Sequence, residues 1–358
     1  MSKINIVNMG IDLGTSRTVI ACDNGVRAFV PSIVGFPKDA VSQKLFGKNV
    51  VVGEEALKHR MALNIIRPFE RGVVKFSDEG MTDEEYNKSI EAARLILEHM
   101  VNIAKEGAIY ESDQFIVRGV LGAPALASIK NKKALLDVAR GILDDVLVAS
   151  EPFTVAYGLG LLTNALIIDI GAGTVDICRM HGVIPTEEDQ ITTTKAGDYV
   201  DGVFFNLIKK KYPDVNLTLN MVKRFKEENA TISEHGEKIY IEVPVKGKPE
   251  RRDVTEELKQ ACRSIVPDIV KGVEGLIASF DPEFQSGLKE NVILAGGGSQ
   301  IIGLKKEIED YMNKTLGYGR VIKIEEPLFA GANGALLLCK DMPDEYWHEL
   351  KSRDSKKL

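Results

Sequence analysis

An apolar strand that ends in an aspartate and then turns on small residues occurs twice in this 358-residue chain. One copy reads MGIDLGTSRTVIA over residues 9–21, and the other reads LIIDIGAGTVDIC over residues 166–178. Aligned without gaps, the copies place Asp12 on Asp169, Gly14 on Gly171, Ser16 on Gly173 and Ile20 on Ile177. A motif repeated at this distance predicts a chain built from two like halves.

Each copy reads as a strand, a tight turn and a returning strand. The tip of such a hairpin can present several backbone N–H groups in one direction, which suits an anion such as phosphate. Two hairpins facing each other would hold a polyphosphate, with Asp12 and Asp169 placed to bind a magnesium ion directly or through its waters. The alternative is a pair of ordinary hairpins with glycine at the turn and an incidental aspartate. The matching register of the two copies favours phosphate binding.

Composition limits the classes of function. The chain is 44% hydrophobic and 27% charged, which is typical of a soluble globular protein, and it is long enough for two or more cores. The net charge is −6 and the isoelectric point is near 5.6, so no global basic field exists to attract nucleic acid or anionic lipid.

Cysteine and histidine spacing argues against metal centres built from these residues. The four cysteines have no C-x-x-C spacing, and the five histidines have no ligand spacing with one another or with the cysteines. No apolar run reaches signal length or ~18 residues, so we expect neither export nor membrane insertion. A reduced, cytoplasmic compartment fits best.

The first half alternates strand and helix patterns. Three antiparallel strands open it, and the turn signal at residues 23–25 links the second strand to the third. Prolines and glycines then interrupt the pattern, so residues 31–77 are interpreted as an inserted subdomain with a short helix starting near Glu54. We then expect a helix over 82–105 that begins with a capping box, a strand over 115–122, a helix over 128–143 and a strand over 146–148.

The second half follows the same scheme. Expected elements are a helix over 152–162, the second hairpin, a helix to residue 211, a polar insertion with a strand over 238–245, and a helical region over 253–280 divided at Pro267. Asp253 with Glu256 is the predicted cap of that region. A strand over 291–295, a helix over 304–313, a strand over 321–324 and a helix over 331–338 complete the pattern.

The two repeated motifs, residues 12–16 and 169–174, resemble the phosphate motifs of the actin, heat-shock chaperone and sugar kinase superfamily. Within that superfamily the chain is most similar to bacterial actins, and in particular to the actin-like proteins associated with magnetosomes. Further landmarks of this resemblance are VGFPKD at 34–39, SEPF at 150–153, KAGDYVD at 195–201 and AGGGS at 295–299.

The resemblance implies an α/β, actin-like ATPase fold. In that fold, two similar halves each have a mixed β-sheet flanked by helices, the nucleotide binds in a cleft between them, and each half carries a small inserted subdomain. The implied division is domain IA at 1–30, 78–156 and 326–347, subdomain IB at 31–77, domain IIA at 157–195 and 257–325, subdomain IIB at 196–256, and a tail at 348–358.

The resemblance also implies ATP and Mg²⁺ as ligands. Implied nucleotide-binding residues are Gly14, Thr15, Ser16, Gly171, Ala172, Gly173, Thr174, Gly197, Lys226, Glu227, Gly296, Gly297 and Gly298. Asp12 and Asp169 are the implied metal-binding and catalytic carboxylates. In the family, a glutamate matching Glu151 orients the attacking water. The structural alternative makes Ser150 a helix N-cap and Glu151 an acid of the first turn.

Other nucleotide folds fit poorly. A dinucleotide-binding G-x-G-x-x-G motif starting at Gly296 would need glycine at Ile301, and the twin hairpins would go unexplained. No P-loop pattern G-x-x-x-x-G-K-[ST] occurs in the sequence.

The implied function is a cytoplasmic ATPase that polymerises with itself into filaments which organise, align or segregate magnetosomes through organelle-associated adaptor proteins. Direct nucleic-acid binding is not expected. The alternatives are a bacterial actin with another cargo, such as a plasmid or the cell-wall machinery, and a small-molecule kinase of the same superfamily. Cell-shape actins use a membrane-inserting N-terminal helix or apolar loop, and residues 1–8 offer none. A heat-shock chaperone would need a further substrate-binding domain after the ATPase.

Overall fold

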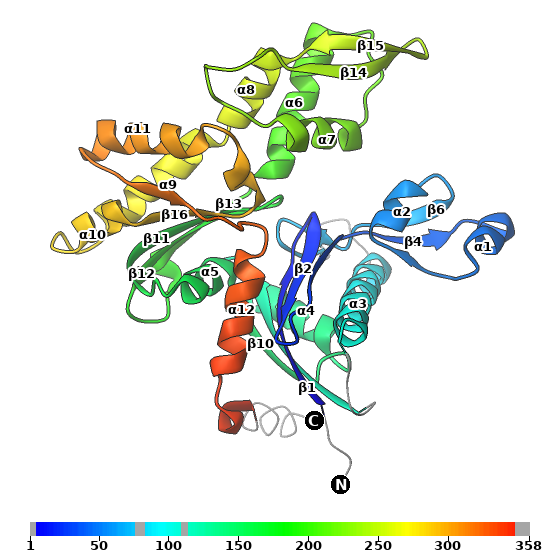
Figure 1. Cartoon of the computed structure of the whole chain (residues 1–358), viewed down its shortest axis with the longest axis horizontal. Helices are drawn as coiled ribbons and strands as arrows, with labels where there is room; N and C mark the ends of the chain where they lie inside the picture. The colour runs from blue at the N-terminus through cyan, green and yellow to red at the C-terminus, as the bar shows by residue number, and fades with distance from the viewer. Residues whose placement is uncertain (1–4, 76–82, 109–113, 348–358) are drawn as a thin grey trace. The chain divides into compact units, whose positions relative to one another are not determined.

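A computed structural model describes residues 5–75, 83–108 and 114–347, and it divides into two compact units (Figure 1). Unit 1 comprises Met1–Leu161 and Leu328–Leu358, and unit 2 comprises Leu162–Pro327. The predicted tail and the start of the capping box at Thr82 lie outside the described residues.

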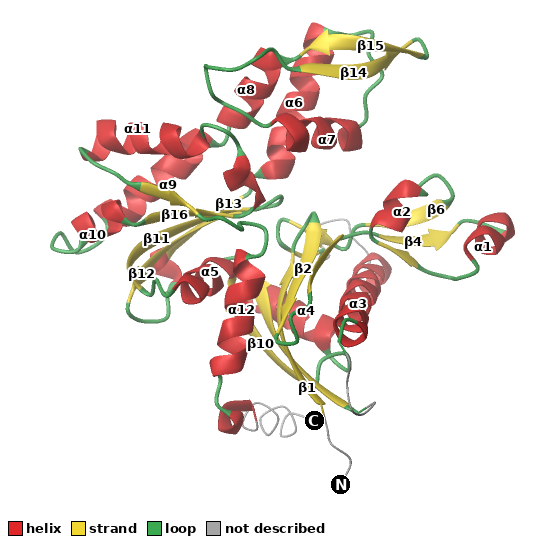
Figure 2. Cartoon of the chain, in the orientation of Figure 1, coloured by secondary structure: helices red, strands yellow, loops and turns green. Residues whose placement is uncertain are grey.

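Unit 1 is built on a five-stranded sheet with the order β10-β9-β1-β2-β3 (Figure 2). Its strands are β1 Asn5–Leu13, β2 Arg17–Cys22, β3 Arg27–Pro31, β9 Phe115–Ala123 and β10 Asp145–Ser150. β1, β2 and β3 pair antiparallel, while β9 lies parallel to both β1 and β10. The three opening strands and the parallel crossover predicted from the sequence are both present.

Helices cover both faces of this sheet. They are α3 Asp83–Glu106, α4 Ile129–Ala139, α5 Glu151–Leu159 and α12 Ala330–Asp341. Alternate residues of β1, from Val7 to Leu13, are buried in one core with α3 and α4. Val120 of β9 belongs to a second cluster with Ala335 and Cys339 of α12. A fully buried aliphatic side chain stabilises by roughly 1.5–3 kcal/mol, so both faces contribute to the unit.

A small segment of short strands and helices connects β3 to α3. It contains β4 Val34–Pro37, α1 Ala40–Phe46, β5 Val51–Val52, α2 Glu54–Lys58, β6 Leu63–Ile66, β7 Phe69–Glu70 and β8 Val73–Val74. Ile33, Val51, Ala56 and Leu63 form a separate small core. Asp39 caps α1, because its side chain accepts a hydrogen bond from the Ser42 N–H at 2.8 Å.

Unit 2 repeats the sheet of unit 1. Its strands are β11 Thr163–Ile170, β12 Val175–His181, β13 Gln190–Thr193, β16 Val292–Ala295 and β17 Val321–Lys323. They follow the order β13-β12-β11-β16-β17, with the first three antiparallel and β16 parallel to β11 and β17. Strand order and direction therefore match unit 1, element for element. The prediction of two like halves is confirmed at the level of topology.

The remaining elements of unit 2 pack on this sheet and on one another. They are α6 Gly197–Lys211, α7 Leu219–Asn229, β14 Tyr240–Val245, β15 Lys248–Asp253, α8 Thr255–Arg263, α9 Val266–Ala278, α10 Gln285–Glu290 and α11 Leu304–Leu316, with 3₁₀ turns η1 Glu187–Asp189 and η2 Gly297–Gln300. One hydrophobic core joins the sheet to the helices. No helix in the described ranges combines the length and apolar character needed to cross a membrane.

Several predicted helix ends were wrong. α4 stops at Ala139, not near 143, and Gly141 follows with a φ of +75°. α5 stops at Leu159 because Gly160 adopts the left-handed conformation that ends a helix. Asp253 does bind an N–H at the start of α8, but that N–H belongs to Thr255 and the helix N-cap is Val254. The division near Pro267 is confirmed, with Pro267 in the first turn of α9.

Close packing of α5 on α12 depends on Gly334. A Cβ on this residue would lie 2.6 Å from the carbonyl carbon of Thr154, and backbone atoms cannot move aside cheaply. Gly331, on the same helix, would place its Cβ 3.9 Å from the Thr154 hydroxyl, which is ordinary contact.

We therefore expect Gly334→Ala to lower the free energy of unfolding by about 1–3 kcal/mol through overpacking. Gly331→Ala is the matched control, and it should be neutral or stabilise by up to about 1 kcal/mol. Urea unfolding of both variants measures the difference. Equal effects would contradict the close contact between the two helices.

Candidate functional site

The turn of the first hairpin has its carbonyl oxygens bound by the protein. The Ser32 hydroxyl donates to the carbonyl of Gly14 at 2.7 Å, and the Ser32 N–H donates to the carbonyl of Ser16 at 3.0 Å. The Thr15 hydroxyl accepts a hydrogen bond from the N–H of Gly72, in the turn between β7 and β8, at 2.7 Å. The inserted segment therefore fixes this turn from one side.

The second hairpin shows the same arrangement with different donors. The N–H groups of Gly197 and Asp198, at the start of α6, donate to the carbonyls of Gly171 and Ala172 at 3.1 and 2.8 Å. The Gly171 N–H closes the turn on the carbonyl of Thr174 at 2.9 Å. Among the described residues, none accepts a backbone hydrogen bond from the N–H groups of Ala172, Gly173 or Thr174.

Carbonyl groups would repel a phosphate, whereas N–H groups attract it. The carbonyls of Gly14 and Ser16 in the first hairpin, and those of Gly171, Ala172 and Thr174 in the second, accept hydrogen bonds from the protein. In the second turn, successive N–H groups without a backbone acceptor could donate to an anion such as phosphate. The predicted phosphate residues Gly14 to Ser16 and Gly171 to Thr174 thus lie in turns suited to that ligand.

Asp12, the last but one residue of β1, has a buried oxygen with no partner. Its Oδ1 atom makes no hydrogen bond among the described residues, and burial raises the pKa of Asp12 from 3.8 to about 6. A buried carboxylate is unfavourable unless a cation or a donor satisfies it. Mg²⁺ prefers such oxygen ligands, so Asp12 fits the predicted magnesium ion.

No group of three or more His, Cys, Asp and Glu side chains that could hold a metal occurs in the described part of the chain. This is compatible with magnesium bound beside a nucleotide, since that ion keeps several waters and needs only one or two carboxylates besides the phosphates.

Glu151 lies close to the end of β1, where Asp12 is. Gly122 of β9 pairs in register with Asp12, and a Cβ on Gly122 would lie 3.1 Å from Cγ of Glu151. Ser150 is indeed the N-cap of α5, but its side chain makes no capping hydrogen bond. Glu151 is therefore both a first-turn residue, as the structural alternative stated, and a neighbour of the Asp12 strand end.

Asp169 occupies the matching place in unit 2, where β11 pairs in register with β16 through Asp169 and Ala295. Gly296 follows with a φ of +74°, and a Cβ there would collide with the Asp169 carboxylate and lie 2.5 Å from the carbonyl oxygen of Ile170. Glycine is therefore required at 296. The second aspartate and the predicted adenosine motif are direct neighbours.

The three predicted adenosine glycines differ in their surroundings. A Cβ on Gly298 would lie 2.9 Å from Cβ of Ile170, so this glycine is needed for packing. A Cβ on Gly297 would meet nothing within 4 Å. Only Gly297 faces open space on which a ligand could lie, and a side chain there would not disturb the fold.

The predicted nucleoside residues on α7 have unequal environments. Lys226 is largely buried, and its ammonium donates to the carbonyl of Gly197 at 2.8 Å and pairs with Asp201 at 2.7 Å. Glu227 is exposed. Lys223, one turn earlier, was not predicted; burial lowers its pKa, and Asp198, Glu227 and Asp201 act against that shift.

The structure thus gathers the predicted residues into two sets. In unit 1 it brings together Asp12, Glu151 and the first turn, and in unit 2 it brings together Asp169, the second turn, Gly197, Lys226 and Gly296. Ser32, Gly122 and Asp201 were missed by the sequence analysis. Asp201 closes the KAGDYVD landmark and could have been noticed there; Ser32 and Gly122 carry no sequence signal.

Comparison with known proteins gives consistent matches over nearly the whole chain. A family model described as MreB/Mbl protein matches residues 6–344. The actin-like protein MamK of Magnetospirillum gryphiswaldense is 40% identical over 346 residues, which are 97% of this chain and 92% of the relative.

Solved structures agree. A MamK double helical filament superimposes with a TM-score of 0.88 at 39% identity, covering 95% of this chain and 100% of that chain. A non-polymerising MamK mutant bound to AMPPNP superimposes with a TM-score of 0.70 at 38% identity, with 95% and 100% covered.

The environment of Asp12 predicts a pH-dependent difference in stability. The folded state raises its pKa to about 6, whereas the unfolded chain has about 3.9. Asp12 is therefore easiest to bury while it is neutral. Its contribution to the free energy of unfolding is largest below about pH 4 and falls as the pH rises to about 6. Asp12→Asn stays neutral and avoids this loss.

Without nucleotide and magnesium, Asp12→Asn should become more stable than the wild type as the pH rises from about 4 to about 7. Thermal unfolding of both proteins in a chelator measures this, and the difference between them cancels other titrating groups. If the difference in stability between the two proteins did not change with pH, the Asp12 carboxylate would have a compensating partner in the folded protein.

Proposed function

The chain belongs to the MreB/Mbl protein family, and we propose that it is an actin-like ATPase that binds ATP with magnesium and assembles into filaments that organise, align or segregate magnetosomes. Support comes from relatives that are MamK proteins and from a matching MamK filament. The main support for ATPase activity is the pair of hairpin turns, in which other groups of the protein donate hydrogen bonds to backbone carbonyls.

In this proposal both turns bind the phosphates of ATP. The N–H groups of the turns donate to phosphate oxygens, and Asp12 and Asp169 hold the magnesium ion directly or through its waters. When bound, magnesium neutralises the negative charge that develops on the phosphates. Gly297 provides the open surface for the adenosine, and Glu227 supplies a polar contact to it.

Glu151 orients the attacking water. It stands at the start of α5, over Gly122 and next to the strand that ends in Asp12, so its carboxylate is held by a rigid helix and a sheet. A carboxylate in this position would accept a proton from water as the water oxygen bonds to the terminal phosphorus and the bond from that phosphorus to the departing ADP oxygen breaks. The phosphates themselves are held by other groups.

The proposed binding partners of this chain are inferred from the same MamK relatives. Copies of the chain assemble head to tail, and contacts of this kind that do not close on themselves generate filaments. Organelle-associated adaptor proteins would connect such filaments to magnetosomes in the cytoplasm. A filament with another cargo is the second candidate, and ATP-dependent pelleting combined with magnetosome position in cells that lack the protein distinguishes the two.

We expect Glu151→Gln to separate assembly from hydrolysis. Loss of a positioned base should lower phosphate release by ~10²–10⁴-fold while ATP still binds. The variant should pellet with ATP and remain polymeric after wild-type filaments have disassembled. Phosphate release and pelleting are measured on the same sample. Phosphate release near the wild-type rate would contradict the catalytic role.

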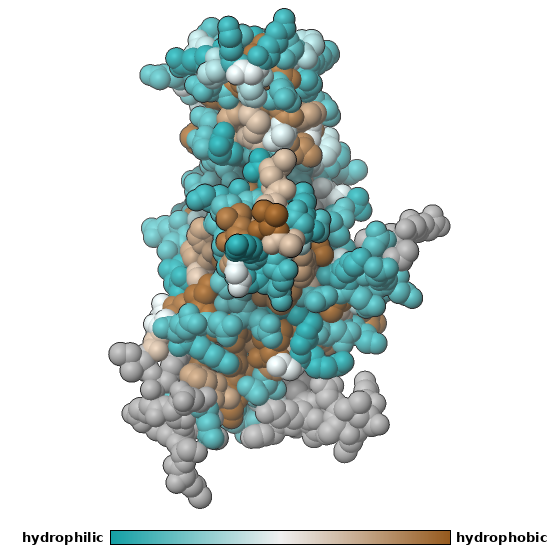
Figure 3. All heavy atoms as spheres, turned by 90° about the vertical axis from the view of Figure 1, so that its right-hand side faces the viewer, coloured by the Kyte–Doolittle hydropathy of each residue, from teal (hydrophilic) through white to brown (hydrophobic). Residues whose placement is uncertain are grey.

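An exposed apolar group on the inserted segment of unit 1 is a candidate for the filament contact. Val41 and Leu45 of α1 and the nearby Met61 are 79%, 67% and 82% exposed. Figure 3 shows apolar side chains gathered on the face of the molecule where α1 lies. Exposed apolar patches mark interaction surfaces, and the occupant proposed here is a second copy of this chain.

Leu45→Asp should therefore raise the protein concentration needed for ATP-dependent pelleting by about tenfold or more, because it places a charge in an apolar contact. ATP affinity should be unchanged. Gln43→Asp adds the same charge to the same helix at a residue outside this apolar group and is the matched control. Equal pelleting of Leu45→Asp and wild type would exclude this surface.

A further inference from the structure

We propose that Lys226 is a positioning residue which, together with Asp201, ties the nucleoside helix α7 to the second phosphate turn. This inference rests on the proposed ATPase. It differs from the role implied by the resemblance, in which Lys226 itself touches the nucleoside.

The contacts of Lys226 are directed into the protein. Its ammonium lies 2.8 Å from the carbonyl oxygen of Gly197 and 2.7 Å from Oδ1 of Asp201. Only 12% of the Lys226 side chain and 8% of the Asp201 side chain are exposed. The ammonium thus donates a hydrogen bond to Gly197 and forms an ion pair with Asp201, both in the first two turns of α6, so Lys226 holds two helices together.

The residue that Lys226 binds is itself bound to the phosphate turn. The Gly197 N–H donates to the carbonyl of Gly171, and the next N–H, of Asp198, donates to the carbonyl of Ala172. A Cβ on Gly197 would lie 3.2 Å from Cα of Ala172 and 3.5 Å from the Lys226 ammonium. A short hydrogen-bonded path therefore runs from α7 through the first turn of α6 to the turn that is proposed to bind phosphate.

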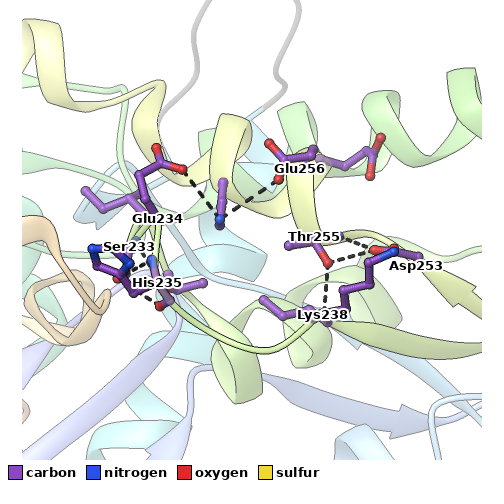
Figure 4. A network of polar contacts seen from close by, with 12 residues as sticks. Ser233, Glu234, His235, Lys238, Asp253, Thr255 and Glu256 are labelled. Carbon is purple, nitrogen blue, oxygen red and sulfur yellow. Dashed lines mark hydrogen bonds and ion pairs between the residues drawn. The ribbon is translucent and has the colours of Figure 1, made fainter.

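The far end of α7 is also fixed. Residues after α7 form a bridge with Ile302, in which the Ile232 N–H donates to the Ile302 carbonyl at 2.8 Å and the Ile302 N–H donates to the Ala230 carbonyl at 3.0 Å. Glu234 then pairs with Arg263 and, at 3.7 Å, with Lys259 of α8 (Figure 4). Since Ile302 lies just beyond η2, this bridge joins α7 to the proposed adenosine loop.

α7 is thus held at one end by the adenosine loop and is connected to the phosphate turn through Lys226 and Gly197. A displacement of the turn by ~1 Å can lower a reaction rate by ~10²-fold, even when the mutated group touches no substrate. Removing one member of a buried ion pair leaves the other charge uncompensated. Loss of either Lys226 or Asp201 is therefore expected to weaken the connection between α7 and α6.

The two roles of Lys226 predict different kinetics. A nucleoside contact of equal strength in ground and transition states changes KM and spares kcat. A positioning role lowers kcat, because the phosphate turn is misplaced in the transition state. Asp201 discriminates further, since its carboxylate forms an ion pair with Lys226 at 2.7 Å and a nucleoside contact by Lys226 alone would not require it.

The test uses the full-length chain with Lys226→Met, the isosteric Asp201→Asn, and the double variant. Lys210→Met, at an exposed position of α6, is the matched control. Phosphate release at saturating ATP is divided by the amount of pelleted protein, which separates turnover from assembly. We expect Lys226→Met to lower kcat by about 10- to 100-fold with a smaller change in KM. Asp201→Asn should act in the same direction, and the double variant should be no slower than the slower single variant.

Lys226→Arg, which retains the charge and the donors, should restore most of the turnover. The proposal would be overturned in favour of a nucleoside contact if Lys226→Met raised KM at unchanged kcat and Asp201→Asn changed neither constant. A lower unfolding midpoint with unchanged turnover of the pelleted protein would reduce the pair to a structural one and also overturn it. Absence of ATP hydrolysis by the wild type would instead refute the proposed function on which this proposal rests.

Discussion

The site depends on how the backbone carbonyls of two tight turns are satisfied. A turn exposes carbonyls as well as N–H groups, and a phosphate is attracted only when the carbonyls are bound elsewhere. In unit 1 Ser32 binds them, directly after β3 ends; in unit 2 Gly197 and Asp198 bind them, shortly after β13 ends. In both units the segment that leaves the third strand covers the turn.

The sheets were predictable from the sequence, whereas several helix ends were not. A repeated strand, aspartate and glycine turn determines a hairpin, and two such hairpins with flanking strand patterns give the shared strand order of both units. Helical periodicity continues past Ala139 and Leu159, so it predicts longer helices than exist. α4 ends because Arg140 leaves the helical conformation, and α5 ends at Gly160 with positive φ; neither backbone conformation can be read from the sequence.

The candidate site was predictable only in part, for a related reason. Asp12 and Asp169 end strands, and Glu151 opens a helix, so sequence position alone places them at the strand ends. Ser32 binds a carbonyl 18 residues away, and Lys226 binds one 29 residues away. Such contacts between side chain and backbone exist only once the tertiary structure has formed. The charged run around Lys226 consequently resembles a solvated helix face, although Lys226 is largely buried.

The two units therefore make different chemical contributions despite their common topology. In unit 1, Asp12 keeps an unsatisfied buried oxygen and Glu151 lies over Gly122, so two carboxyl side chains lie near the same strand end. In unit 2, Gly296 must be glycine because Asp169 and Ile170 occupy the space of its side chain, and Lys226 binds Gly197. There Asp169 packs against Gly296, and Gly197 connects the second turn to α7 through Lys226.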